Sequence, residues 1–231
     1  VVDVPGRSVP DVVLCLGRES QALLEEPHKP YGVRLLRFGG FRCRATLRAA
    51  HPSPPSRRTV LVTPEGDASE VAALFRVALA CARRLPGYRF ILRCHPTFPM
   101  ARACALVPGL TAQPNVTLST SGHLDDDLAR ASMLLHRGSS SMLYAVAQGL
   151  RPVYIHVEGM LDADPLFRLS RWRARCSTPE EFAAILRRHE HTTPEQLEAE
   201  WKPAADYIAT YVQPVEERAI DELVRAVGLQ R

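Results

Sequence analysis

A strand, a turn of small residues and a helix follow one another directly between positions 132 and 149, and this pattern limits the possible folds most narrowly. Ser132–His136 is a short apolar run, Arg137–Ser141 has the sequence RGSSS, and Met142–Gln148 has the composition of a short helix that stops at Gly149. A second apolar run, Pro152–Ile155, follows at once. Buried strand, helix and buried strand in this order are typical of a parallel sheet that helices cover on both faces.

The turn itself has the composition of an anion site. Gly138 is followed by Ser139, Ser140 and Ser141 at the expected start of a helix. The first amides of a helix have no partners within it, the helix dipole favours negative charge there, and serine hydroxyls add donors without bulk. One serine would suffice to cap the helix. Three serines in succession after a glycine favour a site for a phosphate or diphosphate, and we expect this group to belong to a nucleotide.

The same alternation of apolar strands and helices extends through the middle of the chain. Strands are expected at 57–64, 88–96, 115–119, 132–136 and 152–159, with helices between them. Near-continuous apolar strands separated by helices indicate a Rossmann-like α/β domain, to which we assign residues 58–185. In such a sheet, ligands bind beyond the carboxyl ends of the strands.

Shorter segments flank this domain on both sides. Residues 1–50 hold two shorter apolar strands and form a separate segment. Three prolines within residues 51–57 prevent regular structure, so we expect a linker there. Residues 186–231 are expected to form C-terminal helices, one of which begins with the favourable start Thr193-Pro194-Glu195.

Composition limits the class of protein. Hydrophobic residues make up 46% of the 231 residues and the net charge is +4, as in a globular protein. No run approaches the roughly 20 apolar residues that span a bilayer, and the basic clusters are short, which disfavours nucleic-acid binding. The six cysteines form no CxxC pair, so we expect reduced thiols in a cytoplasmic protein without a metal site. The chain lacks an initiator Met and a signal-peptide pattern, and we expect a fragment of a longer protein.

Polar residues follow the ends of the expected strands. They are Glu65-Gly66, His95-Pro96, Gly138–Ser141 and Glu158, and Arg93 lies inside the strand before His95. Parallel strands bring these ends to one edge of the sheet, so we expect these residues to meet around a nucleotide. His95 is suited to donate to a phosphate or to protonate a leaving group. Glu65 is suited to bind a ribose or act on an acceptor hydroxyl, and Glu158 to accept from ribose hydroxyls.

Other patterns are interpreted as structural or are missing. The run Asp125–Asp127 lies at a helix start, where the helix dipole favours acidic side chains, and we interpret it as structural. No GxGxxG motif follows the first strand of the regular region, and there is no Walker-type loop. There is no GxSxG motif either, so Ser139–Ser141 are not expected to act as nucleophiles. A dehydrogenase is therefore disfavoured.

The order of these motifs resembles the C-terminal nucleotide-binding half of GT-B glycosyltransferases. The motifs are a strand followed by Glu65-Gly66, a strand followed by His95-Pro96, and a strand followed by Gly138–Ser141 and a helix. The pattern is most similar to bacterial enzymes that use CMP-activated sugars, the sialyltransferases and Kdo transferases of capsule and lipopolysaccharide synthesis. Those enzymes carry a His-Pro motif and a Ser-Ser motif. The resemblance covers residues 58–185 and the C-terminal helices, which in GT-B enzymes return to the other half.

The resemblance implies a function, a site and partners. His95 and Ser139–Ser141 would contact the phosphate of a CMP-sugar, no metal would be required, and the sugar would pass to a cell-surface glycan or glycolipid. Pro64-Glu65-Gly66-Asp67 matches the acidic motif of these enzymes only in part. Residues 1–50 would supply only the end of the acceptor-side half. The protein would work in the cytoplasm, with peripheral association at the inner face of the membrane possible in this setting.

Two alternatives stay open. Phosphotransferases that use CDP-glycerol or CDP-ribitol share a similar serine-bearing turn between strand and helix. The short first segment also suits a non-catalytic Rossmann-like module that serves as a scaffold within a larger assembly.

Overall fold

The computed structural model describes residues 9–41, 49 and 51–228, and the chain divides into two compact units. Unit 1 comprises Val1–Leu47 and Asp206–Arg231, and unit 2 comprises Arg48–Ala205. The division falls within α7 (Pro194–Tyr211), so the expected C-terminal segment 186–231 is shared between the two units.

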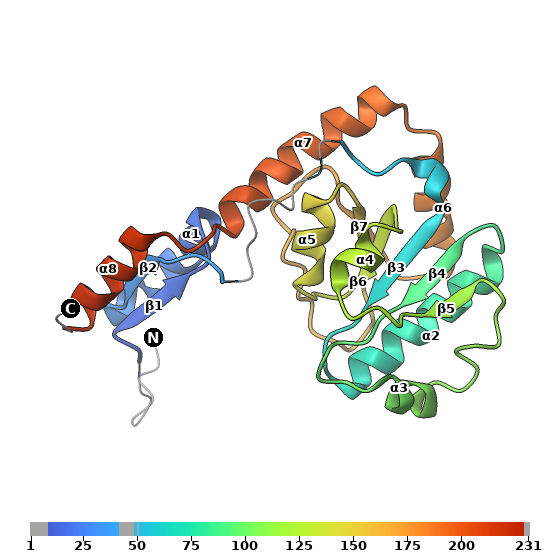
Figure 1. Ribbon diagram of the computed structural model, residues 1–231, viewed down its shortest axis with the longest axis horizontal. Helices are drawn as coiled ribbons and strands as arrows, with labels where there is room; N and C mark the ends of the chain where they lie inside the picture. The colour runs from blue at the N-terminus through green and yellow to red at the C-terminus, as the bar shows by residue number, and fades with distance from the viewer. Residues whose placement is uncertain (1–8, 42–48, 50, 229–231) are drawn as a thin grey trace. The chain divides into compact units, whose positions relative to one another are not determined.

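Unit 2 contains a six-stranded parallel sheet (Figure 1). Its strands, in spatial order, are β5 (Val116–Leu118), β4 (Arg89–Leu92), β3 (Thr59–Thr63), β6 (Met133–His136), β7 (Arg151–Ile155) and β8 (Ala174–Cys176). From β3 the chain builds outward to β5, then returns to the other side of β3 with β6. This is the doubly wound order, and the predicted Rossmann-like α/β class is confirmed. The reversal of strand order makes the carboxyl ends of the neighbouring strands β3 and β6 the expected ligand site.

Helices cover both faces of this sheet (Figure 1). On one face, α2 (Ala68–Arg84), α3 (Met100–Leu106) and α6 (Pro179–Glu190) pack on alternate strand residues such as Val62 and Phe90. The other face holds Leu61 and Leu134, which are fully buried, and α5 (Ser141–Ala147), which packs on β6 and β7. Burial of alternate side chains on opposite faces explains why the strands are apolar almost throughout.

Two tryptophans fix the end of α5 and the start of β7. The indole of Trp172 donates to the carbonyl of Leu150 at 2.9 Å, and that of Trp201 donates to the carbonyl of Val146 at 2.7 Å. Both side chains are buried. Gly149 lies in the sequence between Val146 and Leu150 and adopts φ +81°. It packs against the segment expected to be a linker, because the Ser53 amide donates to the Gly149 carbonyl at 2.9 Å. That segment is therefore part of unit 2.

Unit 1 is a small parallel sheet with helices around it. Its strands are β1 (Val12–Cys15) and β2 (Arg34–Arg37), and its helices are α1 (Arg18–His28), the 3-10 turn η1 (Lys29–Tyr31) and α8 (Glu217–Ala226). The C-terminal segment joins the N-terminal strands, because the amide of Gln213 donates to the carbonyl of Leu16 and its carbonyl accepts from Gly40, both at 2.8 Å. The C-terminal residues thus return to complete the N-terminal unit.

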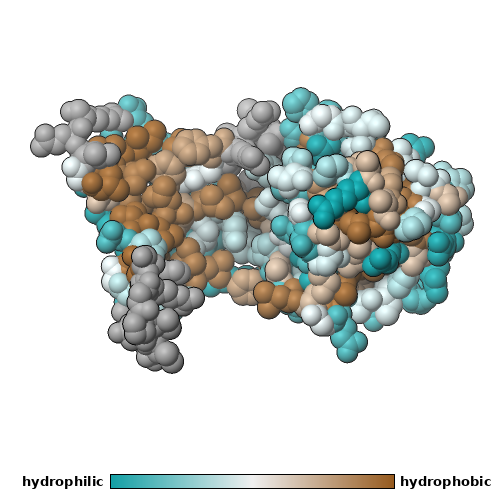
Figure 2. Space-filling model, turned by 90° about the horizontal axis from the view of Figure 1, so that it is seen from below, coloured by the Kyte–Doolittle hydropathy of each residue, from teal (hydrophilic) through white to brown (hydrophobic). Residues whose placement is uncertain are grey.

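Unit 1 leaves apolar side chains on its surface. Leu14 in β1 is 43% exposed and Leu16, just after β1, is 42% exposed. Figure 2 shows apolar residues gathered over this unit. Parallel sheets are usually covered on both faces, so this two-stranded sheet is unusually open.

The thiols and helices bear on two further expectations. The described cysteines are free: Cys15, Cys81, Cys94, Cys104 and Cys176. Cys43 lies outside the described residues. Burial raises the pKa of the Cys81 and Cys176 thiols to about 12, so both stay protonated at neutral pH.

None of the helices within residues 9–41 and 51–228 is both long and apolar enough to cross a membrane.

We predict that Gly149→Ala destabilises unit 2 more than a matched change at Gly159. A Cβ at Gly149 would lie 2.7 Å from the Cα of Pro52 and 2.8 Å from the carbonyl oxygen of His51, whereas no atom lies within 4 Å of one at Gly159. Both residues have positive φ, which costs an alanine about 1–2 kcal/mol. Gly159→Ala should lose only this amount of unfolding free energy in urea titrations, and Gly149→Ala clearly more. Equal losses would contradict the packing.

We also predict that acid destabilises the fold through two buried histidines. Burial lowers the pKa of His136 and of His189 to about 4, from an ordinary value near 6.5. In the unfolded chain both protonate near pH 6.5, but in the folded chain only near pH 4. The free energy of unfolding should therefore fall between pH 6.5 and pH 4, by up to roughly 1.4 kcal/mol per pH unit for each histidine. Above pH 6.5 these two histidines should cause no change in the free energy of unfolding.

The variant His136→Asn isolates the share of His136 in this effect, because an amide oxygen can still accept a hydrogen bond but does not titrate. Its unfolding free energy, measured in urea at several pH values, should fall less steeply between pH 6.5 and pH 4. A slope identical to that of the parent protein would show that His136 does not carry the effect.

Candidate functional site

The candidate site begins at the point where the strand order reverses. Thr63 at the end of β3 and His136 at the end of β6 are partners in the register of these two strands. The chain leaves β3 toward α2 through residues 64–67, and leaves β6 toward α5 through residues 137–140. These two loops flank the place where ligands bind in doubly wound sheets.

The backbone of the serine turn offers two free donors. Gly138 adopts φ +129°, and its amide donates to Nδ1 of His136 at 3.2 Å. A Cβ at Gly138 would lie 2.6 Å from the carbonyl oxygen of Ala163, so no other residue fits there without a shift of backbone. By contrast, the amides of Ser139 and Ser140 find no acceptor among the residues that the structure describes. Successive free amides of this kind form anion sites.

The three serines differ in their surroundings. Ser140 is exposed at the start of α5, and its hydroxyl makes no hydrogen bond to any described residue. Ser139 and Ser141 are each only 8% exposed, and their hydroxyls lie 3.0 Å apart. Ser141 also contacts the Thr63 hydroxyl at 2.7 Å. Of the three serines, Ser140 is the one that is exposed to solvent.

His136 sets the shape of the turn as a neutral acceptor. Its side chain is buried, its ring meets that of Tyr154 edge-on at 5.7 Å, and its lowered pKa keeps it uncharged at neutral pH. Nδ1 accepts from the Gly138 amide, which places the ring proton on Nε2. The sequence indicated only a strand residue at this position.

Arg137 joins three segments at this edge of the sheet, a role that the sequence analysis missed. Its Nε donates to both carboxylate oxygens of Glu70 in α2, at 3.0 and 2.9 Å. Its Nη1 donates to the carbonyl of Ile155 at 3.2 Å, and its Nη2 to that of Leu161 at 2.9 Å. The side chain is only 1% exposed. A buried guanidinium that makes these four contacts positions the serine turn.

Gly66 and His95 are brought together, as the strand-end argument expected. A Cβ at Gly66 would lie 3.0 Å from Nδ1 of His95 and 2.8 Å from Oγ1 of Thr97. Nδ1 accepts from the Thr97 amide at 3.3 Å and lies 2.7 Å from the Thr97 hydroxyl. With Nδ1 as an acceptor, Nε2 carries a proton, for which there is no acceptor among the described residues. His95 is thus a partly exposed donor at the carboxyl end of β4, and Pro96 after it is exposed.

The two acidic residues beside Gly66 have separate roles. Asp67 caps α2, because its carboxylate accepts from the amides of Ser69 at 2.8 Å and Glu70 at 3.3 Å. A hydrogen bond from the Ser69 hydroxyl, together with these amides, lowers the pKa of Asp67. Glu65 is exposed and accepts no hydrogen bond from the described part of the chain. Glu65 is therefore the acid that stays available to a ligand.

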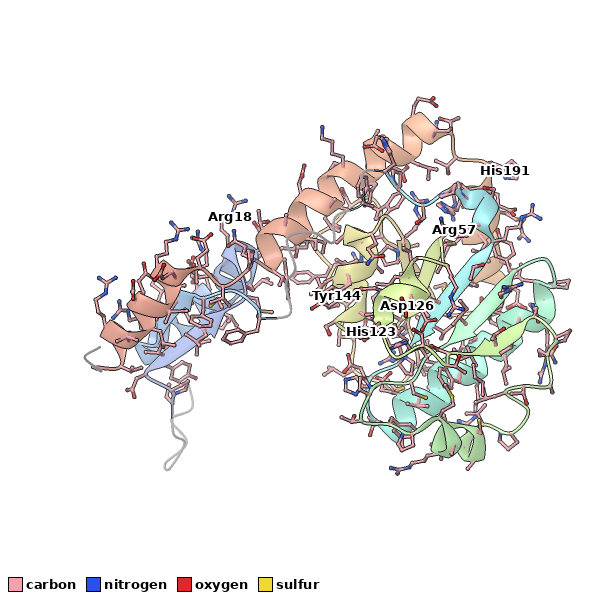
Figure 3. The ribbon with its side chains drawn as sticks, in the orientation of Figure 1. Arg18, Arg57, His123, Asp126, Tyr144 and His191 are labelled. Atoms are coloured by element: carbon pink, nitrogen blue, oxygen red, sulfur yellow. The ribbon has the colours of Figure 1, made fainter. Side chains whose placement is uncertain are left out.

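The Arg93 side chain makes its hydrogen bonds to other residues of the protein. Its Nη1 donates to the buried carboxylate of Asp127 at 2.7 Å and to the carbonyls of Ser121 at 3.1 Å and His123 at 3.3 Å. Burial alone would raise the pKa of Asp127, but hydrogen bonds from Ser119, Arg93 and Arg130 lower it overall. Asp127, the last residue of the acidic run, therefore connects α4 (Leu124–Leu128) to Arg93. Figure 3 labels His123 and Asp126 at this helix. In this structure Arg93 holds the loop after β5 in place.

Glu158 lies in an exposed turn after β7. It precedes Gly159 at φ +78° and accepts no hydrogen bond from the residues described. The loop beyond it is anchored by Asp162, whose carboxylate contacts His156 at 2.9 Å and Arg175 at 2.8 Å. These contacts, that of His156 foremost, lower the pKa of Asp162 to about 2. Glu158 is thus held at the expected edge of the sheet with its carboxylate free.

The fold has known counterparts among solved structures. No protein family model and no curated protein matches the chain. The chain is similar to HepE from Anabaena in complex with UDP, with a TM-score of 0.60, 12% identity, and coverage of 94% of this chain and 64% of that one. For TarM the TM-score is 0.59 and the identity 11%, with coverage of 94% of this chain and 43% of TarM. For the glycosyltransferase SnogD from Streptomyces nogalater the TM-score is 0.51 and the identity 19%, with coverage of 91% of this chain and 56% of SnogD.

At these identities the likeness shows the fold. The chain spans about half the length of the solved chains that it matches. Its six-stranded unit has the Rossmann-like fold of one half of a GT-B glycosyltransferase.

Proposed function

We propose that unit 2 binds the nucleotide of an activated sugar, and that the protein is the donor-binding part of a glycosyltransferase. The amides of Ser139 and Ser140 at the strand-order reversal carry this proposal, because neither has an acceptor in the part of the chain that the structure describes. A folded protein leaves few such donors without an acceptor, and an anion at this position would satisfy both. The likeness of fold to glycosyltransferases supports the proposal.

The available groups suit transfer of a sugar away from a phosphate. The bond between the anomeric carbon and the phosphate oxygen breaks, and its electron pair leaves with the nucleotide. The amides of Ser139 and Ser140, the Ser140 hydroxyl and Nε2–H of His95 would stabilise that departing charge. The acceptor hydroxyl oxygen forms the new bond to the anomeric carbon, and its proton would pass to the Glu65 carboxylate.

The remaining expected residues receive different roles in this proposal. Glu158 would accept hydrogen bonds from the ribose hydroxyls. Gly138 and Pro96 would shape the backbone on which Ser139 and His95 lie. Arg93 would act through the loop after β5, which it holds by its bonds to Asp127 and two carbonyls. No metal is required, because the departing negative charge has amide, hydroxyl and imidazole donors.

The proposed donor is a CMP-sugar, with Kdo or sialic acid as the sugar. The His95-Pro96 and Ser139–Ser141 motifs, which resemble those of CMP-sugar transferases, support this choice. A UDP-sugar is the second candidate, because matched structures of HepE, TarM and the pneumococcal GtfA are described as complexes with UDP. The acceptor would be a bacterial cell-surface glycan or glycolipid.

The exposed apolar surface of unit 1 supports the proposal that this unit is part of an acceptor-binding half. Its two parallel strands leave Leu14 and Leu16 exposed, as expected if further strands of a Rossmann-like half pack there. In this proposal the full enzyme works in the cytoplasm, where a glycolipid acceptor would bring it to the inner face of the membrane.

We predict that CMP binds to the protein and that two substitutions weaken this binding without unfolding it. Ser140→Ala removes an exposed hydroxyl donor and His95→Ala removes Nε2–H, and each should lower the affinity about tenfold, the usual effect of one hydrogen bond to a charged group. Calorimetric titration with CMP, CDP and UDP measures the effect, and the ranking of the three nucleotides identifies the donor.

Ser56→Ala is the matched control, because Ser56 is also exposed but precedes β3 and so belongs to the opposite edge of the sheet. It should leave nucleotide affinity unchanged. Equal affinity of all three variants and the parent would refute the assigned site. No binding of any nucleotide at millimolar concentration would instead favour the non-catalytic scaffold.

A further inference from the structure

Three buried hydroxyls form a chain at the carboxyl ends of the neighbouring strands β3 and β6. Thr63 ends β3 and is only 4% exposed. Its Oγ1 lies 2.7 Å from Oγ of Ser141, which lies 3.0 Å from Oγ of Ser139. The chain therefore runs from the neighbouring strand into the serine turn.

The geometry gives this chain a direction. Ser141 Oγ donates to Ser139 Oγ, which uses the only hydroxyl proton of Ser141. The contact between Thr63 and Ser141 must then use the proton of Thr63. Ser139 Oγ also accepts from the amide of Ser141 at 3.4 Å. Its own proton is thus left without an acceptor in the described part of the chain.

We infer that Thr63 is a positioning residue for the phosphate site, because its hydroxyl directs the chain so that Ser139 donates outward to a ligand oxygen. The inference rests on the proposed nucleotide-binding function. Each hydrogen bond in such a chain polarises the next, so the terminal Ser139 donor is strengthened as well as oriented. Thr63 itself would not touch the nucleotide.

The loss of the Thr63 hydroxyl has a specific consequence. Without that donor, nothing holds the Ser141 hydroxyl in this orientation, so it can rotate its proton away from Ser139 and turn a lone pair toward it. Ser139 can then turn its proton inward to Ser141, and the donor to the phosphate disappears. Threonine suits the position because its branched side chain has few rotamers in a strand, so its hydroxyl direction is set before a ligand arrives.

The test compares Thr63→Val, which keeps the shape but removes the hydroxyl, with Thr63→Ser, which keeps the hydroxyl. Each variant is titrated calorimetrically with CMP and UDP, and with cytidine and uridine, which lack the phosphate. Thr63→Val should lose about tenfold in affinity for the nucleotides, the usual effect of one hydrogen bond to a charged group, and none for the nucleosides. Thr63→Ser should bind like the parent.

A double-mutant cycle separates positioning from general loosening of the fold. Ser139→Ala should weaken CMP binding in the parent but have little further effect in Thr63→Val, because the outward donor is already lost there. Thr63→Ala also removes the Thr63 hydroxyl and should show the same selective loss. It serves as the second variant if Thr63→Val fails to fold, as judged by its melting temperature.

The outcomes separate this inference from the function on which it rests. If the parent binds CMP or UDP and Thr63→Val binds it equally well, the inference is wrong and the nucleotide site stands. Equal loss for nucleotides and nucleosides, or additive effects of the Thr63 and Ser139 changes, also overturns the positioning role. If the parent binds no nucleotide, both are wrong.

Discussion

The site depends on the buried ion pair between Arg137 and Glu70. A guanidinium that is almost fully removed from water is costly unless it is paired and hydrogen-bonded. Here Glu70 supplies both carboxylate oxygens, and the carbonyls of Ile155 and Leu161 accept from the remaining nitrogens. These partners come from the start of α2, the end of β7 and the loop after it. One side chain therefore fixes the position of the serine turn relative to two neighbouring loops.

The polar groups at this edge fall into two sets. In the first set, hydrogen bonds within the protein are complete: Arg93 holds Asp127, Asp67 caps α2, and the Gly138 amide donates to His136. In the second set, groups stay without protein partners among the described residues: the amides of Ser139 and Ser140, Nε2 of His95, and the carboxylates of Glu65 and Glu158. The second set holds donors for a phosphate and acceptors for hydroxyls, which is the division that a sugar nucleotide needs.

Local patterns in the sequence predicted the parallel sheet of unit 2, and the meeting of Gly66 with His95 followed from parallel strand ends. The partners of buried polar groups could not be predicted in this way. Arg137 and Glu70 are 67 residues apart, and Thr63 and Ser141 are 78 apart, so only the folded sheet brings them together. The strand β8 was not predicted, because three residues with an exposed arginine at the centre give no apolar signal. Nor does composition distinguish the exposed Ser140 from the buried serines beside it.

The most direct test is to follow the backbone amides of the serine turn by NMR while a nucleotide is added. Protein labelled with 15N-serine would be titrated with CMP and UDP, and separately with cytidine and uridine, with Ser139→Ala and Ser140→Ala used to assign the two resonances. We predict that a nucleotide moves the amide resonances of Ser139 and Ser140 strongly, and that the corresponding nucleoside leaves them nearly in place. If nucleotides bind and these two amides do not respond, the phosphate lies elsewhere and the account of the site is wrong.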